Sequence, residues 1–521
     1  MGGDGVTARC LMVQGTSSHA GKSLLVAALC RIFAHDGWRV APFKSWNMSL
    51  NSCVTARGGE MARAQVLQAQ AAGVAPHTDM NPLLLKPASG GRVQVILEGR
   101  ALGHLDVREY RRRVASFLPA VLAALRRLRA AYDMVVLEGA GSPAEVNLRE
   151  GDIANMRMAL EAGAPVLLVG DIDRGGVFAS LVGTLELLRP REREQVAGLV
   201  VNKFRGERGL LADGLRWLEE RTGKPVLGVV PYLPGLALDE EDTVNLEAER
   251  RTARGAEAHG CLDVAVIHLP HISNATDFQP LEREPGVRVR YVAATSGLGV
   301  PDAVILPGSK DTVSDLAYLK RSGLAAAVAR LASWRVPVVG ICGGYQMLGI
   351  SIEDPAKVES GTAREEGLGL LPVRTVMARE KHTHLVKAVA RREVVWLGIG
   401  PSRPLLHGYE IHMGRSRTEG EAPLLIVERD GAPAGVEDGA VHPELPVFGC
   451  YLHGLFENRG LREGFLEGLR RARGLPASMP SFDWNEHRER ELDRLAQEVR
   501  TALDIEVLYG LLGIESSRLA P

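Results

Sequence analysis

Short apolar runs ending in Gly, Asp or Glu alternate with longer helix-compatible segments through the first part of the chain. This alternation is typical of βαβ units, in which helices join parallel strands. Helices are predicted at 24–36 and 110–131. Strands are predicted at 10–14, 39–43, 134–137, 165–169, 198–202 and 226–230. The pattern therefore predicts an α/β domain with a parallel sheet.

The alternation restarts after a charged stretch, EAERRTARGAEAHG, that lacks apolar periodicity. A chain of 521 residues is too long for one ordinary core, so we expect two domains. The second set of strands is predicted at 263–268, 303–306, 336–341 and 447–451. We predict a first domain at 1–246, a linker at 247–261, a second domain at 262–460, and a helical segment at 461–521 that packs on the second domain.

Charge and cysteine content narrow the class of partner. The 62 basic and 63 acidic residues leave a formal charge of -1, which gives no electrostatic reason to expect nucleic acid or an anionic membrane. No apolar run is long enough to span a bilayer, and no signal pattern begins the chain. The six cysteines show no CxxC spacing, so neither zinc nor disulfides are indicated. We expect a cytoplasmic protein that acts on small molecules, and the sequence leaves homo-oligomerisation open.

The loop GTSSHAGKS follows the first predicted strand and precedes an apolar helix. Its backbone amides can hold phosphates at the helix N-terminus, Lys22 can neutralise them, and Ser23 can ligate magnesium. One extra residue separates Gly15 from the Gly21 end of the motif, unless Thr16 takes the first glycine position. This variant is typical of dethiobiotin-synthetase-like ATPases. The alternative is a Gly/Ser-rich connection that binds nothing.

Charged residues end two further predicted strands. Lys44 and Glu138 would project at the carboxyl edge of the sheet, where ligands bind. Magnesium prefers hard oxygen ligands, so we predict that Ser23 and Glu138 hold Mg²⁺ and that Lys44 contacts ATP. A solvated charge is the alternative for either strand-end residue. Asp171 and Asp173 occupy a similar position and are candidates to contact metal or nucleotide, with a capping or turn role as the alternative.

The second domain carries a candidate nucleophile in VVGICGGYQMLG. An apolar strand that runs into Cys342 and two glycines is typical of a nucleophile turn, and the helix N-terminus favours thiolate. A buried, inert cysteine is the alternative. His453, after the last strand, is our preferred base, and His412 is its competitor.

Together these residues resemble the cobyric acid synthase family of glutamine-dependent enzymes in cobalamin biosynthesis. The matching segments run in order from residue 12 to residue 458, nearly the whole chain. They include VQGTSSHAGKS, NMSLNS, MNPLLLKP, VVLEGAGSPAEVNLR, DIDRGGVFA, VVNKFRG, LPHISNATDF, LPGSKDTVSDLAYL, GICGGYQMLG, GYEIHMGR and YLHGLFEN. The resemblance implies an N-terminal dethiobiotin-synthetase-like P-loop domain and a C-terminal class I glutamine amidotransferase-like α/β domain.

The resemblance also implies substrates: ATP, glutamine and a corrinoid polycarboxylate, adenosylcobyrinic acid a,c-diamide, whose remaining peripheral carboxylates are amidated through acyl phosphates. Lys22, Ser23 and Glu138 match ATP and metal positions, Cys342 the nucleophile and His453 its base. Asp152 matches an acid thought to help carboxylate activation, with a helix N-cap as an equal alternative. Because ammonia is mostly protonated in neutral water, we hypothesise a sheltered route between the domains.

The implied glutaminase lacks the usual third acid, and the residue two after His453 is Leu455. Glu457 and Glu410 are the candidates that orient the histidine.

Four positions depart from the family pattern: Trp46, Arg57, Arg157 and Ala275. A cation at Arg57 in place of an acid would repel magnesium if it lay beside the metal site. The competing interpretations are a related cobyrinic acid a,c-diamide synthase or other polycarboxylate amide ligase, a deviant P-loop ATPase switch, and a degenerate binding protein.

Overall fold

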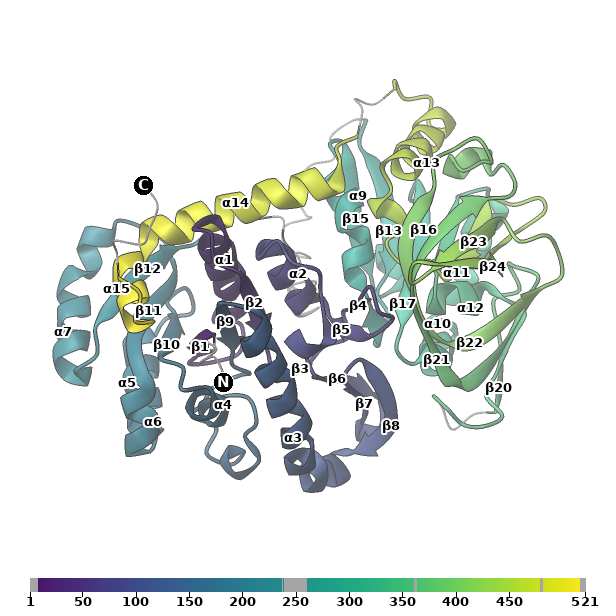
Figure 1. Cartoon of the computed structure of the whole chain (residues 1–521). Coiled ribbons are helices and arrows are strands. Elements are labelled where there is room, and N and C mark those ends of the chain that lie inside the picture. The colour runs from purple at the N-terminus through teal and green to yellow at the C-terminus, as the bar shows by residue number, and fades with distance from the viewer. Residues whose placement is uncertain (1–7, 237, 239–259, 360–362, 478–480, 516–521) are drawn as a thin grey trace.

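The computed structural model describes residues 8–236, 238, 260–359, 363–477 and 481–515. It has two α/β domains side by side, with one long helix running along both (Figure 1). Most of the predicted linker, 247–259, lies outside the described residues. No helix of the described ranges is both long and apolar enough to cross a membrane.

The first domain is built on a six-stranded parallel sheet in the order β12-β11-β10-β1-β9-β2. Its strands are β1 (Arg9–Gly15), β2 (Val40–Phe43), β9 (Met134–Glu138), β10 (Val166–Asp171), β11 (Val196–Phe204) and β12 (Val226–Pro231). All six predicted strands are confirmed, as are the helices α1 (Lys22–His35) and α3 (Val107–Ala131).

Both faces of this sheet are apolar, because alternate residues of each strand face opposite sides. Leu11 and Val13 pack with α1 on one face, whereas Cys10 and Met12 pack with α3 on the other. Further helices complete the two layers: α2 (Arg63–Ala71), α4 (Met156–Ala162), α5 (Val177–Leu187), α6 (Pro190–Gln195) and α7 (Ala212–Thr222). The carboxyl ends of such strands are where ligands bind in α/β sheets.

Small sheets between β2 and α3 extend the first domain toward the second. One sheet has the order β3-β6-β7-β8, with β3 (Trp46–Met48), β6 (Leu83–Ala88), β7 (Arg92–Leu97) and β8 (Arg100–Asp106). A hairpin joins β4 (Ser52–Val54) to β5 (Glu60–Ala62). Contacts of β4 with β21 (Val373–Ala390) and β22 (Leu406–Thr418) place this hairpin against the second domain.

The second domain repeats the layered plan around a sheet in the order β15-β13-β16-β18-β26-β25. Its strands are β13 (Leu262–Ile267), β15 (Val287–Val292), β16 (Ala303–Leu306), β18 (Val338–Ile341), β25 (Ala440–Val441) and β26 (Val447–Cys450). The four predicted strands are confirmed. A second, mostly antiparallel sheet is built on the long pair β21 and β22 and does not correspond to any of those four predicted strands.

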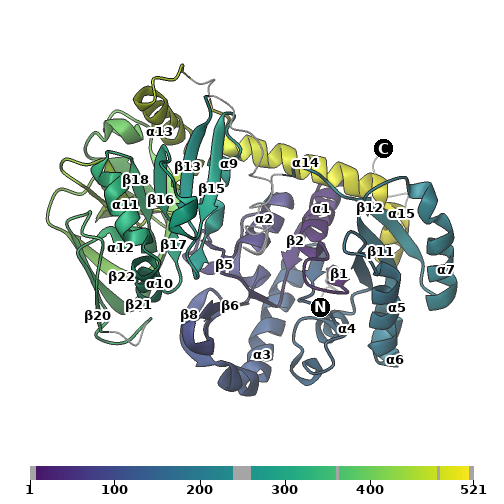
Figure 2. The same ribbon diagram turned by 180° about the vertical axis from the view of Figure 1, so that it is seen from behind.

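The C-terminal helices divide between the two domains. Helix α13 (Arg459–Ala472) stays on the second domain, where buried Arg462 donates to Glu284 at 2.6 Å. Helices α14 (Trp484–Ala502) and α15 (Ile505–Leu511) return to the first domain and bury Leu495 and Tyr509 against α1 and β12 (Figures 1 and 2). The prediction that the whole segment packs on the second domain is therefore wrong for α14 and α15. The spacing of apolar residues in these segments indicates helices, but it does not indicate which domain the helices pack on.

Candidate active sites

The predicted phosphate loop lies between β1 and α1. Gly15 ends β1, and the Thr16 amide donates to the Val169 carbonyl at 2.9 Å. Gly21, just before α1, has φ 93°, and a Cβ there would lie 2.0 Å from Nδ2 of Asn202. Only glycine fits that position. Lys22 curls over the loop, since its Nζ donates to the Ser17 carbonyl at 2.9 Å.

Glu138, at the end of β9, gathers four polar side chains beside this loop. Its Oε1 accepts from Ser23 Oγ at 2.8 Å and from Lys44 Nζ at 2.9 Å. Its Oε2 accepts from Gln65 Nε2 at 3.2 Å and from Gln68 Nε2 at 2.5 Å. The structure thus brings together the three predicted residues Ser23, Lys44 and Glu138. The structure adds Gln65 and Gln68 of α2 to this group. Their spacing in the sequence is that of any helix and did not predict a site.

Residues of the VVNKF segment close the other side of the loop. Asn202 Nδ2 donates to the Ala20 carbonyl at 2.8 Å. Lys203 Nζ donates to the His19 carbonyl at 2.7 Å and to Asp171 Oδ2 at 3.0 Å. Asp173 instead pairs with Arg205 at the surface. Asp171 is therefore tied to the loop through Lys203.

Asp152 lies in the turn before α4. Its Oδ1 accepts from the amides of Ala154 and Asn155, both at 2.8 Å. These are the contacts of an Asx turn, whereas the N-cap of α4 is Asn155. The turn also reaches the nucleotide side, because Asn155 Nδ2 donates to the Ala140 carbonyl, just after Glu138, at 2.7 Å.

Two of the departing positions lie away from the Glu138 cluster. Arg57 is exposed in the β4–β5 turn, and the carbonyl of the adjacent Gly58 accepts from Thr383 of the second domain at 3.0 Å. The expected repulsion of magnesium by Arg57 therefore has no support in its position. Arg157 is exposed and pairs with Glu161. Among the described residues, no group of three or more His, Cys, Asp or Glu side chains is arranged to hold a metal by itself.

Cys342 occupies the predicted nucleophile turn between β18 and α12 (Gly343–Leu348). Its φ of 52° and ψ of -107° are strained for a residue with a side chain, and such strain is typical of functional positions. The flanking glycines are required by space: a Cβ at Gly343 would lie 2.7 Å from the Ser309 amide nitrogen, and one at Gly344 would lie 2.0 Å from the Leu306 oxygen.

His453 lies beside Cys342 and is held by an acid that the sequence did not reveal. Its Nδ1 is 2.7 Å from Oδ2 of Asp277, and both side chains are almost completely buried. Burial by itself would lower the pKa of His453, but the charges of Asp277 and Cys342 outweigh it and raise the pKa to about 10. The buried imidazole is therefore held in its protonated form.

Neither acid proposed for this role contacts His453. Glu457 pairs with Arg63 at 2.8 Å, and Glu410 pairs with Arg429 at 2.9 Å. Asp277 comes from η5 (Ala275–Phe278), within the quoted segment LPHISNATDF. The sequence thus contains the acid in a segment that resembles the family, but the spacing between Asp277 and His453 does not indicate that they are in contact.

His412, the competing base, lines the same cavity but lies in a different setting. Its Nδ1 faces the Gly414 carbonyl at 2.8 Å, and its ring stacks on Tyr451 with centroids 3.7 Å apart. Its contact with a carboxylate is longer than that of His453, since Nε2 lies 3.8 Å from Oε1 of Glu410.

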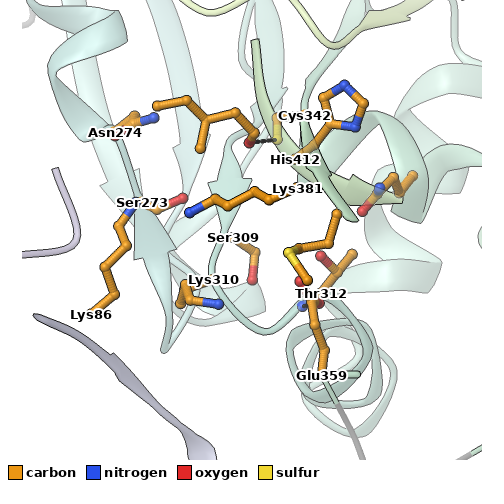
Figure 3. Close-up of a pocket in the computed structure, with 13 residues that line it drawn as sticks. Lys86, Ser273, Asn274, Ser309, Lys310, Thr312, Cys342, Glu359, Lys381 and His412 are labelled. Carbon is orange, nitrogen blue, oxygen red and sulfur yellow. Dashed lines mark hydrogen bonds between the residues drawn. The ribbon is translucent and has the colours of Figure 1, made fainter. Parts of the chain in front are cut away.

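Figure 3 shows the cavity around Cys342, where the thiol donates to the Ile411 carbonyl at 3.4 Å. Ser309, Lys310, Thr312 and Glu359 line it from the second domain, and Lys86 reaches it from the first. Burial raises the pKa of Glu359 to about 7, against the opposing effect of Lys310. The cavity thus offers charged groups of both signs near a thiol, which suits a zwitterionic amino acid.

Two family models match the chain and together cover most of it. The model of the CobQ/CobB/MinD/ParA nucleotide binding domain matches residues 11–245. The model of the CobB/CobQ-like glutamine amidotransferase domain matches residues 263–461.

Curated relatives match over nearly their full length. A cobyric acid synthase of Pelotomaculum thermopropionicum is 54% identical, over 98% of this chain and 98% of the relative. One of Desulforudis audaxviator is 53% identical, over 98% of this chain and all of the relative. One of Moorella thermoacetica is 51% identical, over 98% of both chains.

Proposed function

Because this chain belongs to the cobyric acid synthase family, we propose that it amidates the remaining peripheral carboxylates of adenosylcobyrinic acid a,c-diamide to give adenosylcobyric acid. It is a glutamine-dependent amidating enzyme of cobalamin biosynthesis, with a nucleotide-binding domain and a glutamine amidotransferase domain. The observation that carries the proposal is that one chain holds both a phosphate loop beside Glu138 and a Cys342–His453 pair.

The first domain would activate the carboxylate. An anionic carboxylate resists attack by ammonia, so its oxygen first attacks the γ-phosphorus of ATP, ADP leaves, and an acyl phosphate forms. Such a transfer needs chiefly positioning and charge neutralisation. The loop amides and Lys22 would hold the phosphates. Lys44, whose ammonium is already fixed by Glu138, would add positive charge at the strand end.

Ser23 and Glu138 fit a magnesium site, since their hard oxygens lie 2.8 Å apart beside the phosphate loop. Phosphate oxygens and water would supply the other ligands. The ion would neutralise charge on the transferred phosphoryl group.

The second domain would release ammonia from glutamine. The Cys342 thiolate attacks the side-chain amide carbon, and the His453 imidazolium gives its proton to the departing nitrogen, which leaves as ammonia. A thioester remains. His453 then takes a proton from water, the hydroxide attacks the thioester carbon, and glutamate leaves as the thiolate is restored. Asp277 would hold the ring with its other nitrogen toward Cys342.

Asp152 would serve the first step indirectly. Its carboxylate orders the turn that carries Asn155, and Asn155 fixes the loop after Glu138. This supports a positioning role near the reacting carboxylate. Ammonia then combines with the acyl phosphate, and phosphate leaves as the amide forms.

Location and assembly are part of the same proposal. A reducing, cytoplasmic compartment suits a reactive thiol in a chain whose six cysteines are all free. We propose that the first domain ends at residue 246, that the second begins at residue 262, and that a helical segment follows residue 460. The partners are small molecules and not nucleic acid, and the oligomeric state stays open.

Product analysis tests this function. The full chain is incubated with magnesium-ATP, glutamine and adenosylcobyrinic acid a,c-diamide, and the corrinoids are analysed by mass spectrometry. We expect stepwise exchange of OH for NH₂. Amidation only of cobyrinic acid that lacks the a and c amides would favour the related diamide synthase. ATP hydrolysis without any amidated corrinoid would favour the ATPase switch, and a chain that hydrolyses neither ATP nor glutamine would be a degenerate binding protein.

A further inference from the structure

Glu60, Lys86 and Lys381 form a buried ion cluster across the boundary between the domains. Glu60 on β5 and Lys86 on β6 belong to the first domain, and Lys381 on β21 belongs to the second. Lys86 Nζ lies 2.7 Å from Glu60 Oε1, and Lys381 Nζ lies 2.5 Å from Glu60 Oε2. Their side chains are only 1 to 9% exposed. We call this group the interdomain ion cluster.

An interruption of the β21–β22 ladder brings Lys381 to this place. Met377 pairs with Gly414 and His382 pairs with His412, so the residues from 378 to 381 lie opposite Met413 alone. Bulges of this kind re-aim side chains and are common beside active sites. Lys381 Nζ also donates to Gln94 of the first domain at 3.2 Å. The bulge therefore directs a cation of the glutaminase domain into the synthetase domain.

The interdomain ion cluster borders the cavity of Cys342. Lys86 and Lys381 line that cavity together with the thiol, and in Figure 3 the Lys86 side chain enters from the first domain. Both lysines are already bonded to Glu60, so neither is a spare cation waiting for the carboxylate of glutamine. The cluster thus lies where the cavity of the thiol meets the first domain.

Buried polar side chains continue from this cluster toward Glu138. Ser52 Oγ accepts from Lys86 Nζ at 2.7 Å, next to Asn51 in the chain. Asn47 Nδ2 donates to Gln65 at 2.9 Å, and Gln65 donates to Glu138 at 3.2 Å. Polar groups are costly to bury without hydrogen bonds, and an apolar core needs none of them. The segment from residue 47 to residue 52 therefore connects the two sites along the chain, and its buried polar groups offer hydrogen-bond partners to a small polar molecule.

We propose that the interdomain ion cluster is the gate of the ammonia passage, and that it admits neutral ammonia and rejects ammonium. The inference rests on the proposed function and names the residues of the sheltered route. Ammonia can donate and accept hydrogen bonds along the buried polar groups. The two lysines already occupy both oxygens of the Glu60 carboxylate, so the cluster offers a buried ammonium ion no free negative charge.

The protonation of Lys381 serves the same selection. Burial lowers the pKa of Lys381 to about 7, against the opposing charge of Glu60. The two lysines in turn outweigh burial at Glu60 and hold the pKa of its carboxyl far below the usual range. Burial has made this amine a weaker base than ammonia, so it does not hold a passing ammonia as ammonium. A neutral Lys381 can exchange hydrogen bonds with neutral ammonia.

Lys381→Met tests the gate in the full chain. Glutamate release and corrinoid amidation are measured with glutamine, and amidation is measured again with ammonium chloride as nitrogen source. We expect both glutamate release and ammonia-dependent amidation to stay within about twofold of the wild type. Glutamine-dependent amidation should fall at least about fivefold, with the missing ammonia found in solution. Glu60→Gln should show the same uncoupling.

The matched control is Lys387→Met on the same strand, whose side chain is 40% exposed and pairs with Glu428. Its ratio of glutamate released to amide formed should stay at the wild-type value. The proposal is overturned if that ratio also stays unchanged in Lys381→Met, if glutamate release falls because the KM for glutamine rises, or if ammonia-dependent amidation is lost in the variant alone. Failure of the wild type with ammonium chloride would instead contradict the proposed function.

Discussion

Nδ1 of His453 lies 2.7 Å from Oδ2 of Asp277, although the two residues are 176 positions apart in the chain. The other carboxylate oxygen of Asp277 accepts from the Gly454 amide at 3.0 Å, so the acid is fixed by the residue next to the histidine. A buried acid held at both oxygens can fix the tautomer and the orientation of an imidazole. We infer that Asp277 fills the place in the glutaminase site that Leu455 leaves without a carboxylate.

Asp277→Asn should reduce glutaminase activity by roughly 10²- to 10⁴-fold and leave ammonia-dependent amidation unchanged. The carboxylate raises the pKa of His453, so without it burial dominates and the imidazolium loses its proton at lower pH. In a plot of glutaminase activity against pH, the decline at high pH should therefore begin at a lower pH. Asp430→Asn is the matched control, because Asp430 holds His384 at 2.7 Å and the Leu385 amide at 2.9 Å outside the site. Wild-type glutaminase rates in Asp277→Asn would exclude the role.

Cys342→Ser should lower glutamine hydrolysis by more than about a thousandfold, because serine lacks a thiolate. Amidation with ammonium chloride should persist, since the nucleotide site is untouched. Cys261→Ser, at a half-buried cysteine outside the cavity, should change neither rate. Loss of both reactions in Cys342→Ser would contradict the division of labour between the domains.

Lys22→Ala should stop amidation from either nitrogen source, by more than about a hundredfold, because the phosphates lose their neutralising charge. Glutamate release should remain measurable. Corrinoid amidation is followed with each source, and Lys224→Ala, before β12, is the comparison variant. Normal amidation by Lys22→Ala would remove this lysine from the mechanism.

Ser23→Ala should raise the magnesium concentration for half-maximal amidation by about tenfold, because one hard oxygen ligand is lost. The Lys44–Glu138 pair stays intact, so folding should be unaffected. Ser23→Thr keeps the hydroxyl and should behave like the wild type. Magnesium titrations with the same midpoint for all three proteins would refute the metal role of Ser23.

Leu495→Ala on α14 should lower the free energy of unfolding by about 2 to 5 kcal/mol, because the residue is 2% exposed in the core of the first domain. Val507→Ala, at a 40% exposed position of α15, should cost much less. Urea unfolding followed by circular dichroism measures both. Equal midpoints would mean that α14 contributes little to that core.

The parts of the molecule that short-range patterns determine were predictable. Runs such as 10–14 and 134–137 are apolar enough to identify as strands, and the glycines beside Lys22 and Cys342 mark both turns. The predictions that depend on distant partners were incomplete. Asp277 meets His453 because η5 packs against η8 (Leu455–Glu457), which follows the histidine. Lys381 reaches Glu60 through an irregularity of the β21–β22 pairing that no short-range pattern predicts.

Helix α14 crosses from one domain to the other and ends in the first, so the glutaminase module is held at both its beginning and its end. In topological terms the second domain is therefore an insertion within the first domain. If the gene were divided between residues 246 and 262, the N-terminal fragment would expose the apolar surface of α1 that α14 covers. Only the C-terminal fragment, which carries α14, could cover that surface. Such fragments should work when co-expressed and should fail when prepared apart.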